Sequence, residues 1–332
     1  MAVRDSDSRI GVVLLQLGGP DSLEAVEPFL YNLFCDPDII DLPGAFLFRK
    51  PLARFISTRR GPKVQEIYRK MGGRSPILKL TNRQARALER ALAPDLQAKV
   101  YVAMRYWHPL TDATVDRIVK DGIRRVVLLP LYPHFSKSTT GSSVREWERV
   151  LAARGVASIT STLVRDYCEH PRYIQAVVRS IGYALRRIPE ADRGKTHLVF
   201  SAHGTPMSLV RAGDPYQAQI VKTYNAAVRA GNFGLPHHLC YQSKVGPQKW
   251  LEPSLVDTID RLAADGVSHM VVVPIAFVSD HSETLVEINM EARHQARERG
   301  VRHFDMTPAL NACAPYIEAL ADVVRRSAGG TA

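Results

Sequence analysis

The chain has 332 residues, of which 45% are hydrophobic and 23% charged, so its composition is ordinary for a globular protein and its length allows two compact domains. Its longest apolar runs, near Val12–Leu15 and Met270–Val278, are far shorter than the roughly 18 residues of a membrane-spanning helix, and its polar first ten residues do not resemble a secretory signal. The net charge is +11, and the four cysteines share no C-x-x-C spacing, which argues against a disulfide framework and favours a cytoplasmic protein.

Short β-branched and apolar runs alternate along the chain with longer helical patterns, which is typical of βαβ units and parallel sheets. In chain order, the predicted strands are Ile10–Leu17, Lys99–Arg105, Arg125–Leu131 and Ser158–Leu163, and then His197–Ala202, His237–Gln242, His269–Ala276 and Arg302–Met306. The predicted helices between them include Thr81–Ala93, Tyr173–Arg187, Gln217–Gly231 and Ser254–Ala264.

The two sets of strands resemble each other. The stretch DGIRRVVLLPLYPHFS at 121–136 is repeated in kind by DGVSHMVVVPIAFVSD at 265–280, and LQLGGPDS at 15–22 resembles FSAHGTPMS at 200–208. We therefore predict an α/β fold of two similar, doubly wound Rossmann-like halves, residues 1–165 and 166–332. The carboxyl ends of their strands are predicted to face each other across a ligand cleft. The alternative is a pair of unrelated Rossmann-like domains.

The positive charge is concentrated in one segment. Between Arg49 and Arg74 there are nine basic residues and one acid, Glu66, so this segment alone carries +8. A carboxylate-bearing ligand, an anionic membrane surface or nucleic acid would each match that charge. No recognised nucleic-acid motif accompanies it, and we predict no nucleic-acid partner. The overlapping stretch Gly44–Ile56, GAFLFRKPLARFI, is interpreted either as an apolar lip that touches a membrane or as a core helix with snorkelling cations.

One histidine stands at the end of a predicted buried strand. His203 precedes Gly204-Thr205-Pro206, at the carboxyl end where open α/β sheets place their functional residues. A neutral imidazole there can accept a proton or bind a metal near pH 7. The alternative is a histidine that only hydrogen-bonds a neighbouring loop.

A group of acidic residues forms a second candidate site. Asp280 and His281 are followed by three glutamates at i, i+4 and i+8, namely Glu283, Glu287 and Glu291. This spacing places the glutamates along one face of a helix. Carboxylates with imidazole suit ferrous iron and can relay protons. The alternative is that Asp280-x-x-Glu283 is a capping box and that the later glutamates are solvated.

Several strings in the same order resemble the ferrochelatase family over nearly the whole chain. They are LLQLGGPDSLEAVEPFLYNLFCDP, RRGPKVQEIYRKMGGRSPI, AMRYWHP, PLYPHFSKSTTGSS, FSAHGTP, CYQSKVGPQKWLEPS and PIAFVSDHSETLVEI. The resemblance implies two Rossmann-like domains with a porphyrin cleft. It also implies an enzyme that inserts ferrous iron into protoporphyrin IX to form protoheme, the last step of heme biosynthesis.

The resemblance also implies roles for particular residues. The family's central histidine falls on His203, which accepts a pyrrole proton or binds the metal, and its acidic partner falls on Glu283. Asp280, His281 and Glu287 support that pair, and His203 and Glu283 are the candidate metal ligands. The residues that match the family's substrate pocket are Leu17, Arg60, Lys63, Tyr68, Ser75, Arg105, Tyr106 and Trp250. We further expect His203 and Glu283 to face each other across a gap that holds the flat tetrapyrrole.

The same resemblance sets the expected partners. Ferrous iron is a substrate, and no permanently bound cofactor is predicted. The chain ends with only Cys313 where some relatives carry a cluster-binding cysteine extension, so we expect no iron–sulfur cluster. The partners predicted are porphyrin, iron and, at the lip, a membrane surface contacted from the cytoplasm. A coproporphyrin or other tetrapyrrole chelatase, and a tetrapyrrole-binding protein without chemistry, are the alternatives.

Overall fold

The computed structural model describes residues 9–39, 45–244 and 248–329. The chain forms two compact units. Unit 1 consists of residues 1–166 together with 317–332, and unit 2 consists of Tyr167–Tyr316. Each unit contains one four-stranded parallel sheet with helices packed against it, so the predicted α/β class is confirmed.

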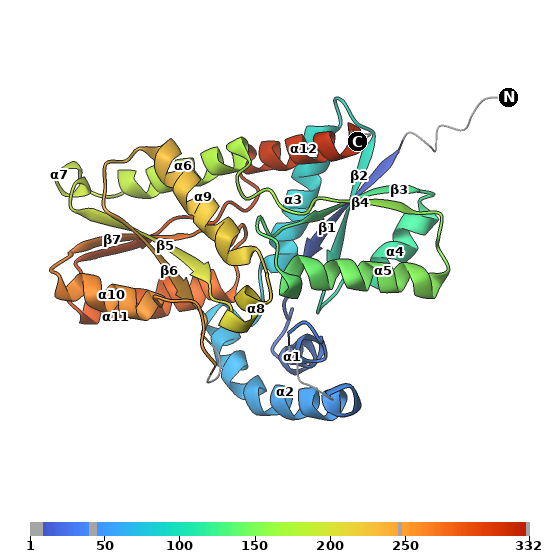
Figure 1. The fold of residues 1–332 in the computed structure, drawn as a ribbon, viewed down its shortest axis with the longest axis horizontal. Helices are drawn as coiled ribbons and strands as arrows, with labels where there is room; N and C mark the ends of the chain where they lie inside the picture. The colour runs from blue at the N-terminus through green and yellow to red at the C-terminus, as the bar shows by residue number, and fades with distance from the viewer. Residues whose placement is uncertain (1–8, 40–44, 245–247, 330–332) are drawn as a thin grey trace. The chain divides into compact units, whose positions relative to one another are not determined.

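Unit 1 is built around a sheet of strand order β2-β1-β3-β4. Its strands are β1 (Ile10–Gln16), β2 (Ala98–Met104), β3 (Arg125–Pro130) and β4 (Thr160–Leu163). Its helices are α1 (Val26–Phe34), α2 (Ala45–Lys70), α3 (Ile77–Leu92), α4 (Thr111–Lys120), the π-helix η2 (Lys137–Gly141) and α5 (Ser142–Arg154). Helix α1 lies alongside α2 (Figure 1).

Unit 2 repeats this topology with the strand order β6-β5-β7-β8. Its strands are β5 (Thr196–His203), β6 (His237–Gln242), β7 (His269–Pro274) and β8 (His303–Met306). Its helices are α6 (Pro171–Arg186), α7 (Glu190–Arg193), α8 (Met207–Arg211), α9 (Tyr216–Gly231), α10 (Leu255–Ala264), the π-helix η3 (Glu283–Ala292) and α11 (Arg293–Glu298). All eight predicted strands are present, with ends that shift by one or two residues.

The strand register shows how closely the two units correspond. Leu15 pairs with Pro130 in unit 1, and Ser201 pairs with Pro274 in unit 2. Pro130 and Pro274 are themselves equivalent in the repeated sequence, 144 residues apart. Leu15 is therefore equivalent to Ser201, and two residues further on Leu17 is equivalent to His203.

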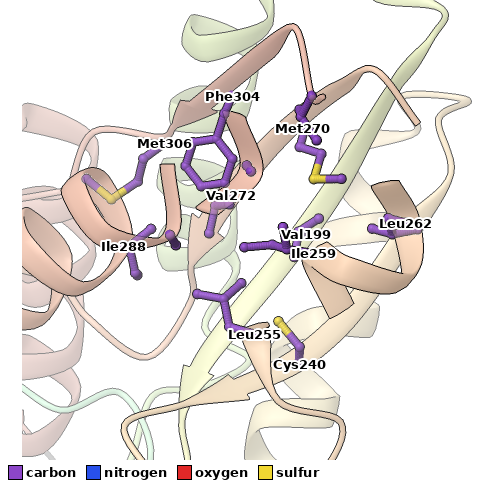
Figure 2. Packing of buried hydrophobic residues seen from close by; sticks show 13 residues of the cluster. Val199, Cys240, Leu255, Ile259, Leu262, Met270, Val272, Ile288, Phe304 and Met306 are labelled. Carbon is purple, nitrogen blue, oxygen red and sulfur yellow. The ribbon is translucent and has the colours of Figure 1, made fainter. Parts of the chain in front are cut away.

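The core of unit 2 lies between its sheet and the helices that follow β6 and β7. Figure 2 shows Val199, Val272 and Phe304 of the sheet together with Ile259 of α10 and Ile288 of η3. These side chains are buried, and a fully buried aliphatic side chain contributes about 1.5–3 kcal/mol of transfer free energy. The apolar side of η3 is thus held against the core, which leaves its glutamates on another side.

One predicted boundary is wrong. Residues 317–332 were expected in the C-terminal half, but they belong to unit 1. Most of helix α12 (Ala314–Gly329) packs there, because Arg325 donates to the carbonyl of Ala91 at 2.8 Å and pairs with Asp95 at 2.7 Å. Arg125 also donates to the carbonyl of Ala328 at 3.2 Å.

The segment interpreted as a lip or a core helix is helical. It forms the first part of α2, although Gly44 and the side chains of residues 45–47 lie outside the described part of the structure. Phe48 is 68% exposed and Phe55 is 65% exposed, while Ala53 is buried. Two large aromatic side chains on the outer side of α2 do not fit the interpretation of a core helix.

Candidate active site

The centre of the site is a hydrogen-bonded pair at the end of β5. His203 is the last residue of that strand, and its Nδ1 lies 2.7 Å from Oε2 of Glu283, the first residue of η3. The bond fixes the imidazole so that Nδ1 carries the proton donated to the carboxylate, which leaves Nε2 as the free ring nitrogen in the neutral form. The two side chains are 38% and 25% exposed. The pair is thus anchored yet open to a ligand.

A second carboxylate joins this pair through a serine. Ser243 follows β6, and its hydroxyl lies 2.6 Å from Oε2 of Glu287 and 3.0 Å from Oε2 of Glu283. Its backbone N–H donates to Oε1 of Glu287 at 2.8 Å. Sequence analysis did not single out Ser243, because one serine in a loop carries no periodic signal.

The acidic cluster is arranged differently from a capping box. The backbone N–H of Asp280 donates to Asn311 rather than to Glu283, and Asn311 in turn donates to the Asp280 carboxylate. His281 Nδ1 contacts the carbonyl of Ser279 at 3.0 Å, and its Nε2 lies 3.6 Å from Oε1 of Glu283. The capping-box alternative is therefore wrong, since Glu283 turns toward two histidines.

The third glutamate is more exposed than the other two. Glu291 is exposed, whereas Glu283 and Glu287 are partly buried. Glu283 and Glu287 lie on a π-helix, whose hydrogen bonds join residues five apart, so residues four apart still lie near the same side. Segments of π-helix often occur at functional sites.

The pKa shifts follow from the charges and the burial. Burial lowers the pKa of His203, but the charge of Glu283 and the hydrogen bond to it outweigh burial and raise the pKa overall. Burial raises the pKa of Glu283, yet the charges and bonds of His203 and His281 hold it well below its usual range. For Glu287, burial and then the charge of Glu283 raise the pKa. His203 and Glu287 therefore both bind a proton more readily than the same groups do in water.

His203 and Glu283 are not separated by the gap that the sequence predicts. His203 and Glu283 were expected to face each other across a bound ring, but they touch directly and both belong to unit 2. Edge-on aromatic rings flank the imidazole instead, with the ring centroids of Trp250 and Phe277 each 6.4 Å from that of His203. Both candidate metal ligands are thus on one side of any ligand they meet. No group of three or more His, Cys, Asp or Glu side chains in the described ranges is arranged to hold a metal ion.

Unit 1 contains a second polar cluster, centred on a residue that sequence analysis missed. The carboxylate of Asp36, only 1% exposed, pairs with Arg105 at 2.8 Å and accepts a hydrogen bond from Tyr106 at 2.6 Å. The hydroxyl of Ser142 also donates to it, while Arg105 donates to Ser142 at 2.7 Å. Burial acts to raise the pKa of Asp36, but the bonds from Ser142 and Tyr106 and the charge of Arg105 lower it.

The predicted pocket residues of unit 1 fall into two groups. Tyr106 and Tyr68 are buried in one apolar cluster, and Leu17 packs against it. Arg60 and Lys63 are exposed on α2, so their charges are accessible to a ligand. Tyr106 therefore supports Arg105 in this structure rather than presenting its ring to solvent.

The position of Ser75 explains why residue 19 is glycine, in the Gly18-Gly19-Pro20 sequence that follows β1. The N–H of Ser75 donates to the carbonyl of Pro20 at 2.7 Å. A Cβ added at Gly19 would lie only 2.6 Å from the hydroxyl of Ser75, so only glycine allows this approach. The Gly-Gly-Pro turn thus holds the start of α3 close to the carboxyl end of β1.

Comparisons with known proteins agree with this architecture. SirB from Bacillus subtilis with Fe3+ has a similar structure, with a TM-score of 0.59 over 97% of this chain and 96% of that chain at 12% identity. A sirohydrochlorin chelatase SirB from Bacillus subtilis subspecies spizizenii, in complex with cobalt, gives a TM-score of 0.54 at 12% identity over 96% and 95% of the two chains. The repeated parallel sheets define a protein of the chelatase fold.

The sequence relatives are more specific than the fold. A model of the ferrochelatase family matches residues 9–328. A ferrochelatase of Trichodesmium erythraeum (strain IMS101) is 46% identical over 96% of this chain and 82% of its own length. One of Geotalea daltonii is 45% identical over 97% and 98%. The chain belongs to the ferrochelatase family, the enzymes that insert iron into a porphyrin, and the predicted family is confirmed.

Proposed function

We propose that the protein inserts ferrous iron into protoporphyrin IX and that His203 is the group that removes the pyrrole protons. The observation that carries this proposal is the 2.7 Å bond between His203 Nδ1 and Glu283, because it leaves Nε2 free to accept a proton. Insertion releases two N–H protons for each iron bound, so a base at the ring nitrogens is a chemical requirement.

The carboxylates support this base in two ways. The charge of Glu283 stabilises the imidazolium that forms when His203 accepts a proton, and this raises the pKa of the histidine. Glu287 has a raised pKa and touches Ser243, which also touches Glu283. A proton that leaves His203 thus has a nearby carboxyl to receive it before it reaches solvent.

We further propose that exposed cations of unit 1 bind the carboxylates of the substrate. Arg60 and Lys63 are exposed on α2 and suit the anionic propionates of a porphyrin. Arg105 is different, since its charge is already paired with Asp36 at 2.8 Å. The exposed Phe48 and Phe55 favour a lipophilic dicarboxylate such as protoporphyrin over the more carboxylated coproporphyrin.

The test is an anaerobic mixture of the protein with ferrous iron and either porphyrin, followed by absorbance. We expect the free-base spectrum of protoporphyrin to be replaced by that of protoheme, and coproporphyrin to react more slowly. Faster metalation of coproporphyrin would reverse the choice of substrate. A free-base spectrum that persists while porphyrin fluorescence reports binding would leave only a tetrapyrrole-binding protein.

A contact between α2 and a membrane surface is also proposed. Phe48 and Phe55 are exposed on a helix whose neighbouring residues Arg54, Arg59 and Arg60 are exposed cations. No helix in the described ranges has the length and apolar character to cross a bilayer. We expect the protein to bind vesicles that contain anionic lipid and to lose that binding when Phe48 and Phe55 are both changed to serine. Equal sedimentation of the double variant with vesicles would contradict the contact.

A further inference from the structure

Ser243 has an unusual backbone conformation for its residue type. Its φ is +66°, in the left-handed region that non-glycine residues seldom adopt. The residue directly follows β6, so this conformation turns the chain at the carboxyl end of the strand. Left-handed backbone at a side chain of this kind persists only where surrounding contacts impose it.

Those contacts are with the two carboxylates of the site. The hydroxyl reaches both Glu287 (2.6 Å) and Glu283 (3.0 Å), and the N–H of Ser243 donates to the other oxygen of Glu287. The hydroxyl has one hydrogen, so it donates to one carboxylate at a time. The backbone N–H keeps Glu287 in place in either case. Ser243 therefore holds the carboxyl groups of Glu283 and Glu287 close to each other.

The equivalent residue in unit 1 has a comparable role. Leu15 pairs with Ala103 and Ser201 pairs with Cys240, so counting three residues onward makes Tyr106 the equivalent of Ser243. The hydroxyl of Tyr106 also donates to a carboxylate, that of Asp36. Both units thus place a hydroxyl after their second strand to fix an acid.

From this geometry we infer that Ser243 is a positioning residue, which holds Glu283 and Glu287 so that the Glu283 carboxylate stays aimed at Nδ1 of His203. The inference rests on the proposed function of His203. Without the hydroxyl, Glu283 loses one of its hydrogen-bond donors and gains freedom to rotate away from the imidazole. Residues that orient a reacting group in this way typically contribute 10- to 100-fold to activity.

The test is the substitution Ser243→Gly. Glycine suits a φ of +66° and keeps the N–H, so the substitution removes the side chain with its hydroxyl and leaves the backbone contact with Glu287. We expect kcat to fall about tenfold or more, with the porphyrin Kd, measured by fluorescence quenching, unchanged within about twofold. The downfield NMR signal of the His203 imidazole proton, assigned by its absence in His203→Leu, should shift or broaden. Ser243→Asn, whose amide can donate and whose backbone tolerates this φ, should recover part of both properties.

Two sets of results distinguish the possible failures. An unchanged His203 signal in Ser243→Gly overturns the inference, whether or not kcat changes. An altered signal in a protein that metalates no porphyrin would support the positioning role and overturn the proposed function. If Ser243→Gly unfolds at a lower temperature than the wild type, Ser243→Asn is compared with the wild type instead, at a temperature at which both are folded.

Discussion

The two polar clusters lie at equivalent ends of two similar sheets, yet they balance charge differently. In unit 1, one carboxylate, Asp36, meets one guanidinium, Arg105, and the two side chains are 1% and 18% exposed. In unit 2, the carboxylate of Glu283 contacts the imidazoles of His203 and His281, Glu287 is linked to it through Ser243, and the His203 side chain is 38% exposed. A balanced, buried cluster stabilises a fold, whereas an unbalanced, accessible one shifts the pKa of its members and can move protons.

The sequence differences between the repeats account for this contrast. In both units a π-helix follows the third strand, η2 in one and η3 in the other. The strand pairing already makes Leu17 equivalent to His203. After the third strand, adding 144 to the residue numbers of unit 1 gives the equivalent positions of unit 2, and this pairs Thr139 with Glu283 and Ser143 with Glu287. Unit 1 thus has an aliphatic residue and two hydroxyls where unit 2 has a base and two acids.

The largest effect is expected when the base of unit 2 is replaced by the residue that unit 1 has. His203→Leu should lower kcat by about 10³-fold, because general base catalysis typically contributes 10²- to 10⁴-fold. Porphyrin affinity should change little. Anaerobic metalation kinetics measure the first and fluorescence quenching the second. The matched control is His294→Leu, on an exposed histidine of α11, which should leave kcat unchanged. A similar loss in both variants would contradict the role of His203.

Asp36 should affect stability instead. Asp36→Ala leaves the mostly buried Arg105 without its partner. We therefore expect the free energy of unfolding to fall by about 3 kcal/mol. Urea denaturation, followed by a spectroscopic signal from unit 1, measures this loss. The control, Asp116→Ala, breaks the exposed pair with Arg154 and should cost less than about 1 kcal/mol. Equal losses in the two variants would show that burial of the Asp36 pair adds nothing.

The pH dependence gives a second check on Asp36. Its pKa is lowered in the folded protein, so its contribution is complete above the unfolded-state pKa and is lost as the pH falls through the folded-state pKa. The stability difference between the wild type and Asp36→Ala should therefore shrink in acid. A difference that grows on acidification would contradict the lowered pKa.

The sequence predicts the sheets well but the side-chain partners only in part. Apolar, β-branched runs such as His269–Ala276 identify strands, because a strand's hydrophobic pattern is contained in the few residues that form it. The bond between His203 and Glu283 joins residues 80 positions apart. Their positions in the sequence identify each as a candidate site residue, but they do not show that the two side chains are in contact. Ser243 and Asp36 lie within strings that resemble the family, but neither periodicity nor spacing singles them out. An amphipathic pattern also cannot say which unit α12 packs against.

A smaller effect is expected from the carboxylate beside the base. Glu283 raises the pKa of His203, so Glu283→Gln should lower that pKa and move the acid limb of the kcat/KM profile to lower pH. The maximal rate should fall by about 10²-fold, since the imidazole loses its charged partner. Glu291→Gln, on the exposed side of the same π-helix, is the control and should leave the profile in place. An acid limb that moves to higher pH in Glu283→Gln would refute the assignment.

The smallest effect concerns the exposed cations of unit 1, which contrast with its paired Arg105. Lys63 is exposed on α2, and its attraction for a propionate is weakened by water and salt. We expect Lys63→Gln to raise the porphyrin KM about threefold with kcat unchanged, and the increase should disappear at about 1 M salt. Lys120→Gln removes the same charge from the exposed side of α4 and should not change KM. If both substitutions raise KM equally, the attraction comes from the overall charge of the protein, and Lys63 has no particular part in holding the carboxylates of the porphyrin.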